Sequence, residues 1–466
     1  MDLSSRLRAI VKSGPPKPGA PGLSERDVQA SRRELTYEPD TGRYESAMDL
    51  SQVGAILGGQ PVDTPFGRCL VIDRRYEADR WHGSIQIGQC EVDDLRALLV
   101  LDPALAVSRL ARGLTPVPRT IFIDLETTGL SGGAGTVAFL VGCGFFDLGA
   151  FQVRQFLLTS YAAERALLAA VADFFAGADL IVTYNGKSFD VPMMETRWLF
   201  HRLRMPLEEV PHFDMVHSAR RLWRTRSSSG DGNEGDCRLS TLEHTLFDVT
   251  RVGDVGGFEI PSRFFRFLRS GDARPLEAVL EHNRIDLVSL AAVMARAVEL
   301  ARTGHSSCRD GAEALALGRV YERAAGDVRV ARRDELTGHA AACYHRGTES
   351  RSAEVKAEAL YRLALWHRRE RRYGEAATIW RDVLELTDPR GVRRMAGMRA
   401  LRRFAAEALA IHHEHRDRDL GSARELALFA LEEADADSRV AEGMRHRLAR
   451  LDKKIAKKTD AQLLWS

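Results

Sequence analysis

The sequence predicts an α/β domain over residues 116–302, with helices flanking a mixed sheet, followed by an all-α domain over residues 311–455. In the first range, apolar runs rich in β-branched and aromatic residues alternate with helix-length segments, a pattern typical of α/β domains. The second range is rich in Ala, Leu, Arg and Glu and has few helix-breaking residues, which indicates helices throughout. At 466 residues, the chain has room for two or three domains.

The N-terminal part divides into two segments. Residues 1–50 are polar and contain the stretch PPKPGAPG, which favours neither helix nor strand, so we expect a flexible tail. Residues 51–115 contain the runs TPFGRCLVIDRRY and HGSIQIG, which predict a small β-containing extension beside the sheet of the next domain. Arg74, Arg75 and His82 are candidates for phosphate contacts there, but surface charge is the simpler interpretation.

The α/β range contains its elements in the order strand, strand, strand, helix, strand, helix. We expect the first three strands to form an antiparallel meander. The run SGGAG at 131–135 lacks the lysine of a phosphate-binding loop and predicts a turn, whereas SSSGDGNEGD at 227–236 predicts a disordered excursion. The predicted strands are 120–125, 137–146, 150–158 and 179–184, and the predicted helices are 162–176 and 192–203.

Two carboxylates lie in the first strand of this range. Asp124 and Glu126 are two residues apart in the run TIFIDLETTGL, so both side chains fall on one face of a strand. Like charges held this close need to be neutralised, and a divalent cation with oxygen ligands commonly does so. The pair therefore indicates a metal site, and a solvated or salt-bridged pair is the alternative.

Another aspartate follows the fourth strand. Asp190 comes after the turn signal Asn185-Gly186 and shortly before Pro192, which places it at a strand-to-helix junction. A functional aspartate and a helix-capping aspartate are both consistent with this position.

A third motif lies in the helical run AVLEHNRIDLVSLAAVMARAVEL, residues 278–300. His282 and Asp286 are four residues apart and therefore share one helix face. A structural histidine paired with an aspartate is the alternative to a catalytic pair. The apolar positions that define the helical period are Leu280, Leu287, Leu290, Val293 and Val298.

Taken together, the three segments resemble the DEDD superfamily of 3′-to-5′ exonucleases, which share the ribonuclease H-like fold and hold two divalent metal ions with four acidic residues. The spacing between His282 and Asp286 departs from that of the histidine subclass of this superfamily, which has four residues between the histidine and the aspartate. It is instead the spacing of the tyrosine subclass. The positions that match its three motifs are, in order, Asp124 and Glu126; Asp190 with Asn185 and Phe189; and Asp286 with His282.

A more specific resemblance is to the YprB-like bacterial exonucleases, a branch that includes mitomycin repair factor B and that has the histidine at this short spacing. The resemblance covers roughly residues 60–300, and the helical tail agrees in type. The matching blocks are ETTGL at 126–130 with the glycine-rich stretch at 131–135, FLVG at 139–142, TYNGKSFD at 183–190, LSTLE at 239–243 and HN-x-x-D at 282–286.

The resemblance implies a two-metal-ion site. Asp124, Glu126, Asp190 and Asp286 would hold two Mg²⁺ or Mn²⁺ ions, which prefer oxygen ligands, whereas zinc prefers nitrogen and sulfur. Two such ions about 4 Å apart can activate a water molecule and stabilise the leaving oxygen of phosphodiester hydrolysis.

The other implied site residues act on the water and the substrate. His282 would orient or deprotonate the attacking water, since imidazole titrates near neutral pH. By resemblance, Thr127 would contact the terminal 3′-hydroxyl, and Asn185 would face the substrate or support the site.

The resemblance implies a 3′-to-5′ exonuclease that acts on a single-stranded 3′ end of DNA, in DNA repair beside a helicase partner. An RNA exonuclease is an alternative, because telling DNA from RNA depends on contacts with the 2′-position and the sequence assigns none. A helical-repeat adaptor that binds nucleic acid without cutting is another. Four mutually repelling acids around one cleft favour the enzyme, because an adaptor has no need of them.

The composition bounds these interpretations. Lys and Arg number 67 against 65 Asp and Glu, a net charge of +2, so any surface that binds nucleic acid must be a local patch. The six cysteines are scattered without a C-x-x-C pair and indicate reduced thiols. The N-terminus lacks the apolar core of a signal peptide, and no uncharged run could cross a bilayer. We therefore expect a cytoplasmic protein with no membrane partner.

Two segments interleave arginine with aromatic residues, as surfaces that bind single strands do. They are RLWR at 221–224 and RFFRFLRS at 263–270. In the second, the helical spacing of Phe264, Phe267 and Leu268 favours core positions, with the arginines outside.

The helical tail carries recurring small and aromatic residues that resemble tetratricopeptide repeats. Successive units lie roughly 46 residues apart instead of about 34, so we expect TPR-like hairpins with insertions. Such stacks often present a groove to a protein partner, here the helicase, and a plain helical bundle is the alternative. His412, His413 and His415 could bind a metal or be ordinary solvated side chains. The recurring residues are Leu317, Gly318 and Tyr321; Ala364, Ala376, Trp380 and Pro389; and Ala423 and Ala430.

Overall fold

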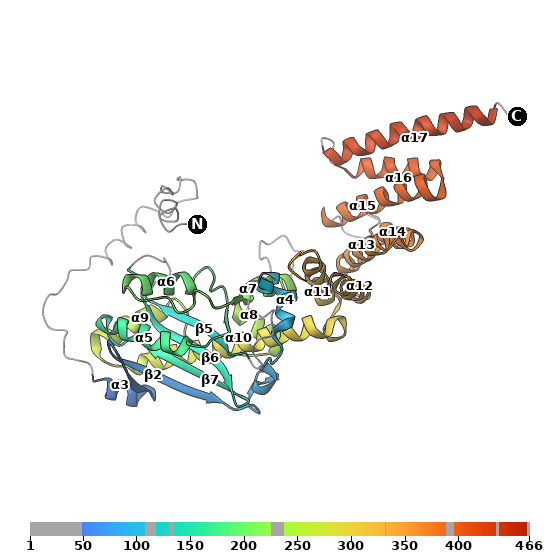
Figure 1. The fold of residues 1–466 in the computed structure, drawn as a ribbon. Coiled ribbons are helices and arrows are strands. Elements are labelled where there is room, and N and C mark those ends of the chain that lie inside the picture. Colours follow the sequence, from blue (N-terminus) through green and yellow to red (C-terminus); the bar gives the residue numbers. More distant parts are fainter. Residues whose placement is uncertain are drawn as a thin grey trace, which may run out of the picture. The chain divides into compact units, whose positions relative to one another are not determined.

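The computed structural model describes residues 49–107, 118–129, 135–224, 237–330, 332–387, 396–434 and 438–463 (Figure 1). All of these residues belong to one of the two units into which the chain divides, Met48–Ser466. The predicted tail up to residue 48, residues 131–134 of the glycine-rich stretch and the predicted polar excursion lie outside the described ranges. Within those ranges, no helix has both the length and the apolar character needed to span a membrane.

A mixed sheet organises the first half of the described chain. Seven of the described strands form it in the order β1-β2-β7-β6-β5-β8-β9. Pairing is antiparallel from β1 to β5, and β5, β8 and β9 are parallel, as the predicted crossover through a helix requires. The predicted mixed sheet is therefore confirmed. The strands are β1 (Gln60–Thr64), β2 (Gly67–Tyr76), β5 (Thr120–Thr127), β6 (Ala138–Asp147), β7 (Ala150–Leu157), β8 (Leu180–Thr183) and β9 (His212–Asp214).

The segment at 51–115 contributes directly to this sheet. After α3 (Leu50–Leu57), β1 and β2 form a hairpin, and β2 pairs with β7 from Leu70 opposite Leu157 to Tyr76 opposite Phe151. The strands predicted beside the sheet are thus two of its members. The segment continues with a small separate sheet and a short helix, which are β3 (Trp81–His82), β4 (Ile85–Gln86) and α4 (Leu98–Leu101).

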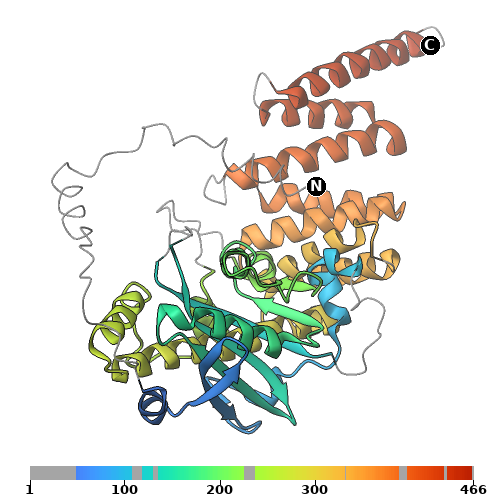
Figure 2. The ribbon, with the colours of Figure 1, turned by 60° about the vertical axis from the view of Figure 1, so that its left-hand side comes forward.

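The two faces of the large sheet are covered by different helices (Figure 2). On one face, Phe122 and Phe151 pack in the same core as α10 (Glu277–Thr303). On the other face, Ile123 packs with α5 (Glu164–Phe175), since neighbouring side chains of a strand point to opposite faces. Further helices of this half include α6 (Asp190–Phe200), α7 (Met215–Leu222) and α8 (Leu239–Phe247).

Helix α9 (Ile260–Ser270) places the arginine-aromatic run at 263–270 as its spacing predicts. Pro261 lies in its first turn, and Gly271 ends it with a φ of 71°. Phe264 is buried and stacks on Phe139, and Phe267 is buried as well, so the predicted core positions are confirmed for both.

Helix α10 is 27 residues long and is buried along most of its length. The apolar positions predicted from the helical period all lie in the interior. Because His282 and Asp286 lie on this helix, its packing against the sheet fixes their position.

The C-terminal half of the described chain is all-helical, as predicted (Figure 1). The recurring small residues pack at helix contacts. Gly318, for example, lies so close to Tyr344 that an added Cβ would be 2.5 Å from its ring. The helices are α11 (Gly311–Ala325), α12 (Arg333–Gly347), α13 (Ala353–Arg369), α14 (Tyr373–Leu386), α15 (Ala396–His412), α16 (Leu420–Glu432) and α17 (Arg439–Leu463), with a π-helical turn at His413–Asp417.

The interior of the α/β half continues into the first of these helices. Leu300 of α10 and Tyr321 of α11 belong to the same core as Phe122 of the sheet. Buried Glu313 of α11 accepts hydrogen bonds from Trp223 Nε1 at 2.8 Å and from Arg296 Nη2 at 2.8 Å. The two halves therefore share an interior.

Candidate active site

Strand β5 positions Asp124 and Glu126 near its end. The side chain of Asn283, on α10, donates through Nδ2 to the carboxylate Oδ2 of Asp124 at 2.8 Å and to its carbonyl oxygen at 3.2 Å. Beyond Glu126, the register with β6 shifts at Thr127, which breaks the regular ladder at the point where the acids emerge. Asn283 thus holds one oxygen of Asp124 in a fixed orientation.

A glycine allows α10 to approach β5 this closely. Gly142 of β6 lies opposite Asp124, and a Cβ at this position would be 2.1 Å from Oδ1 of Asn283. Gln155 of β7 donates to the same Oδ1 at 2.7 Å, so the amide of Asn283 is held on both sides. A side chain at residue 142 would therefore push Asn283 away from Asp124.

Asp190 is the first residue of α6. Burial raises the pKa of its carboxylate, and the backbone N–H groups of Asp190 itself and of Leu125, next to Asp124, act in the opposite direction. The preceding loop turns at Asn185, whose φ is 68°, and buried Asp214 accepts from the N–H groups of Asn185 at 2.7 Å and Lys187 at 3.0 Å. Asp214 therefore shapes the loop that delivers Asp190 to the site.

Helix α10 brings the third pair into the same place. His282 Nδ1 lies 2.7 Å from Oδ1 of Asp254, and its Nε2 lies 3.4 Å from Oδ2 of Asp286. Because a carboxylate can only accept, Nδ1–H of His282 donates to Asp254. When the ring is neutral, Nε2 therefore carries no proton and can act as an acceptor. Although burial opposes it, the hydrogen bond from His282 helps hold the pKa of Asp254 below its usual range.

Arg251 links three carboxylates at this point. Its Nη2 donates to Oδ1 of Asp286 at 2.5 Å, and its Nη1 donates to Asp254 at 3.1 Å. Its Nε and Nη2 also form a two-point contact with buried Glu243 at 2.5 and 2.9 Å. Glu243 is bonded in turn to Ser289 of α10. Arg251 thus ties the loop at 248–259 to the helix that carries His282 and Asp286.

The four predicted acids lie close enough to change one another's ionisation. Burial raises the pKa of Asp124 well above its usual range, and the charges of Asp286, Glu126 and Asp190 raise it further. Burial and the charges of Asp286 and Asp190 raise the pKa of Glu126 to about 8. Burial raises that of Asp190 to about 7 and also raises that of Asp286, against the opposing effect of Arg251. This is an excess of negative charge that a cation would relieve.

The donor set fits hard divalent cations, because every predicted ligand is a carboxylate oxygen. Among the residues that the structure describes, however, no three His, Cys, Asp or Glu side chains are close enough together to hold an ion. The carboxylate of Asp286 is held by Arg251 instead. Binding of an ion therefore requires carboxylates of the site to rearrange from the positions that the structure describes.

The structure thus brings together Asp124, Glu126, Asp190, Asp286 and His282 from three separate segments. Of the predicted substrate contacts, the Thr127 hydroxyl donates to the Gly129 carbonyl at 2.9 Å, and Asn185 lies in the loop before Asp190. No pattern in the sequence marks Arg251, Asp254 or Asp214 as site residues. Glu243 and Asn283 lie in the matching blocks, but the sequence alone assigns them no role.

The other candidate phosphate contacts have structural partners. Arg74 donates to the carbonyl groups of Leu57 and Gly58, Arg75 pairs with Glu77, and His82 bonds to Ser289. In RLWR, Arg221 donates to the Leu101 carbonyl and Trp223 to Glu313.

Comparisons with known proteins identify the family of the chain. A family model described as RNase_H superfamily matches residues 121–298. The uncharacterized protein YprB of Bacillus subtilis (strain 168) is 30% identical over 339 residues, which cover 72% of this chain and 75% of YprB. The family B DNA polymerase from the hyperthermophilic archaeon Pyrobaculum calidifontis matches with a TM-score of 0.32 and 13% identity, over 54% of this chain and 30% of the polymerase. The chain therefore belongs to the YprB family, and its residues 121–298 form a domain of the RNase H superfamily.

Proposed function

We propose that this protein is a metal-dependent 3′-to-5′ exonuclease that hydrolyses phosphodiester bonds of DNA. The observation that carries the proposal is the set of four carboxylates, drawn from three segments, whose pKa values are raised by burial and, for Asp124 and Glu126, also by the charges of Asp286 and Asp190. A fold has no stabilising use for such a cluster, whereas a site for two divalent cations requires it.

Each side chain has a role in this proposal. Asp124, Glu126, Asp190 and Asp286 would hold two Mg²⁺ or Mn²⁺ ions, which when bound supply water activation and stabilisation of the leaving oxygen. His282 accepts the proton of the attacking water at Nε2.

Neighbouring side chains hold these groups in place. Asn283 orients Asp124 through its amide, and Asp254 fixes the ring of His282 by accepting from Nδ1. Thr127 and Asn185 would face the 3′-terminal nucleotide. The fixed ring of His282 lowers the reorganisation needed at the reactive step.

DNA as the substrate, a role in repair and a helicase partner for the helical region belong to this proposal by resemblance. RNA is the rival substrate, because the described site residues include no assigned contact to a 2′-hydroxyl. The alternative function of a different class is an adaptor that binds nucleic acid without cutting it.

The proposal is tested with full-length protein and 5′-labelled single strands of DNA and RNA, each with Mg²⁺, Mn²⁺ or EDTA. We expect the DNA to shorten stepwise from its 3′ end with either metal and not with EDTA. Digestion of a strand whose 3′ end is blocked, or cutting in EDTA, would contradict the mechanism. Faster digestion of the RNA would favour the rival substrate, and metal-bound protein that cuts neither strand would favour the adaptor.

The contact between Asp254 and His282 gives a more specific prediction. Asp254→Asn keeps an oxygen acceptor for Nδ1 but removes the negative charge that stabilises the protonated ring. We expect kcat to fall by about 10- to 100-fold with little change in KM, as removal of such supporting groups commonly does. Asp254→Ala should have the larger effect, because it also releases the ring.

The matched control is Asp327→Asn, which removes a carboxylate that also pairs with an arginine but lies in the helical region. A rise in KM at constant kcat would instead place Asp254 in contact with the substrate.

A further inference from the structure

The last helix of the chain carries more positive charge than the whole protein. Helix α17 contains eight Lys and Arg residues and three Asp and Glu residues, a formal charge of +5, whereas the full chain has a charge of +2. Ion pairs with neighbouring acidic side chains do not neutralise this excess of positive charge in full. Within the described part of the chain, Lys453, Lys457 and Lys458 form no ion pair and are exposed.

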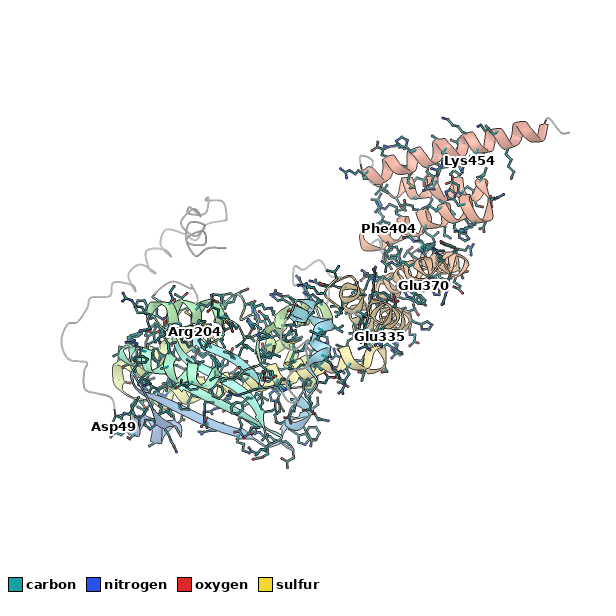
Figure 3. The ribbon with its side chains drawn as sticks, viewed as in Figure 1. Asp49, Arg204, Glu335, Glu370, Phe404 and Lys454 are labelled. Carbon is teal, nitrogen blue, oxygen red and sulfur yellow. The ribbon has the colours of Figure 1, made fainter. Side chains whose placement is uncertain are left out.

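The charge is concentrated on one side of the helix. Met444, Leu448 and Leu451 are buried and mark the side that packs on the rest of the array. At about 100° per residue, the cations of residues 447–458 fall within an arc of about 140° beside and opposite this apolar side. We call this side the basic face of α17; Figure 3 labels one of its members, Lys454. Its residues are Arg447, Arg450, Lys453, Lys454, Lys457 and Lys458.

A buried carboxylate organises half of the basic face. Glu414, in the π-helical turn, pairs with Arg447, Arg450 and Lys454, each at 2.8 Å. Although burial opposes it, the hydrogen bonds and charges of Arg450 and Lys454 hold the pKa of Glu414 at about 2, so the carboxylate stays charged at any ordinary pH. One negative charge against three cations leaves the cluster positive. Glu414 thus holds the three cationic side chains in place without neutralising them. The neighbouring predicted metal candidates His412 and His413 pair with Asp417 instead.

We propose that the basic face of α17 binds the sugar-phosphate backbone of nucleic acid. The proposal rests on the nuclease function proposed above, since that function supplies a polyanionic ligand. At a rise of about 1.5 Å per residue, the face is about 16 Å long, which matches about five phosphates of one strand at the spacing of about 3.4 Å along a duplex axis. A row of lysines and arginines without base-specific geometry would bind with little regard to sequence.

The rest of the helix surface argues against the other anionic ligands. A protein partner usually requires aromatic or apolar anchors at the centre of its interface. Binding in a membrane surface likewise requires an exposed apolar face. Between residues 442 and 458, the exposed apolar side chains are Ala449 and Ala456 alone, because the larger ones are turned inward. The exposed side of α17 can therefore bind a ligand mainly through its positive charge.

The test measures binding without catalysis. Full-length protein in EDTA is titrated into a fluorescein-labelled 30-nucleotide DNA strand, and anisotropy is recorded at several salt concentrations. The variant Lys453→Gln/Lys457→Gln/Lys458→Gln removes three exposed cations and leaves the partners of Glu414 intact. Its matched control, Arg302→Gln/Arg333→Gln/Arg351→Gln, removes the same charge from exposed positions outside α17.

We expect the α17 variant to bind about tenfold more weakly than the control at low salt. The slope of log K against log salt should also fall by about 2, the value for three phosphate contacts on a single strand. Equal affinity and equal slope in the two variants would overturn the proposal, as would loss of binding to anionic lipid vesicles in the α17 variant while DNA binding is unchanged. Because the assay needs no cleavage, a failure of the proposed nuclease activity would leave this result unaffected.

Discussion

Replacing Asp124 with asparagine should abolish nuclease activity, with a fall in kcat of at least about a thousandfold. The carboxylate of Asp124 is the one that all three other acids act upon, so it is the natural shared ligand of two ions. Loss of metal-ion stabilisation of the transition state costs several kcal/mol, which corresponds to this factor. Asparagine has nearly the same shape, and its Oδ1 can still accept from Asn283. The fold should therefore survive, which circular dichroism and thermal denaturation would check.

The same substitution should stabilise the protein in the absence of metal. Asp124 is charged only at a high cost in free energy when buried among three other acids, and an amide avoids that cost. The matched control is Asp63→Asn, which removes an exposed carboxylate from β1 of the same sheet. Full nuclease activity in the Asp124→Asn variant would show that the proposed active site is wrong. An inactive Asp286→Ala variant that keeps its fold would support it independently.

The metal-free protein should lose stability as the pH rises, and divalent cations should restore it. Folding raises the pKa of Glu126 from 4.5 to about 8 and that of Asp190 from 3.8 to about 7. Between those values the folded state binds more protons than the unfolded state, so the free energy of unfolding falls with increasing pH. One pKa unit is worth about 1.4 kcal/mol, so we expect a loss of several kcal/mol between about pH 5 and about pH 8.

Urea denaturation in EDTA and in Mn²⁺ across this pH range measures the effect. With Mn²⁺ bound, the acids remain ionised in the folded state, and the decline should disappear. The variant Glu126→Gln/Asp190→Asn should show a flatter profile in EDTA and little response to Mn²⁺. A wild-type profile in EDTA that is flat, or that rises with pH, would show that the acids are not held together as the structure has them.

The residues that could be predicted from sequence are those whose positions follow from local periodicity. Alternation along β5 places Asp124 and Glu126 together, and the helical period of α10 places His282 over Asp286. The predicted boundaries of the strands and helices between residues 120 and 203 agree with the structure to within three residues for the same reason.

The supporting contacts could not be predicted, because they depend on tertiary approach. Arg251 reaches Asp286 across 35 positions of sequence, and Asn283 reaches Asp124 across 159. No local pattern marks Gly142 as the glycine that admits Asn283. The position of β1 at the edge of the sheet, with β2 next to it, likewise depends on the pairing of β2 with β7, which lies far along the chain.

The length of α10 affects how the protein unfolds. Its first half carries the histidine and aspartate of the site, and Tyr321 of α11 donates to the carbonyl of Ala301 near its other end, at 2.9 Å. Because both ends of α10 are buried, unfolding at one end also exposes apolar surface at the other end. The sheet and the first helices of the array should consequently denature in a single cooperative step. A fragment ended after α10 would keep the four acids of the candidate site but would expose the apolar surface that α11 covers, and it should therefore be prone to aggregate.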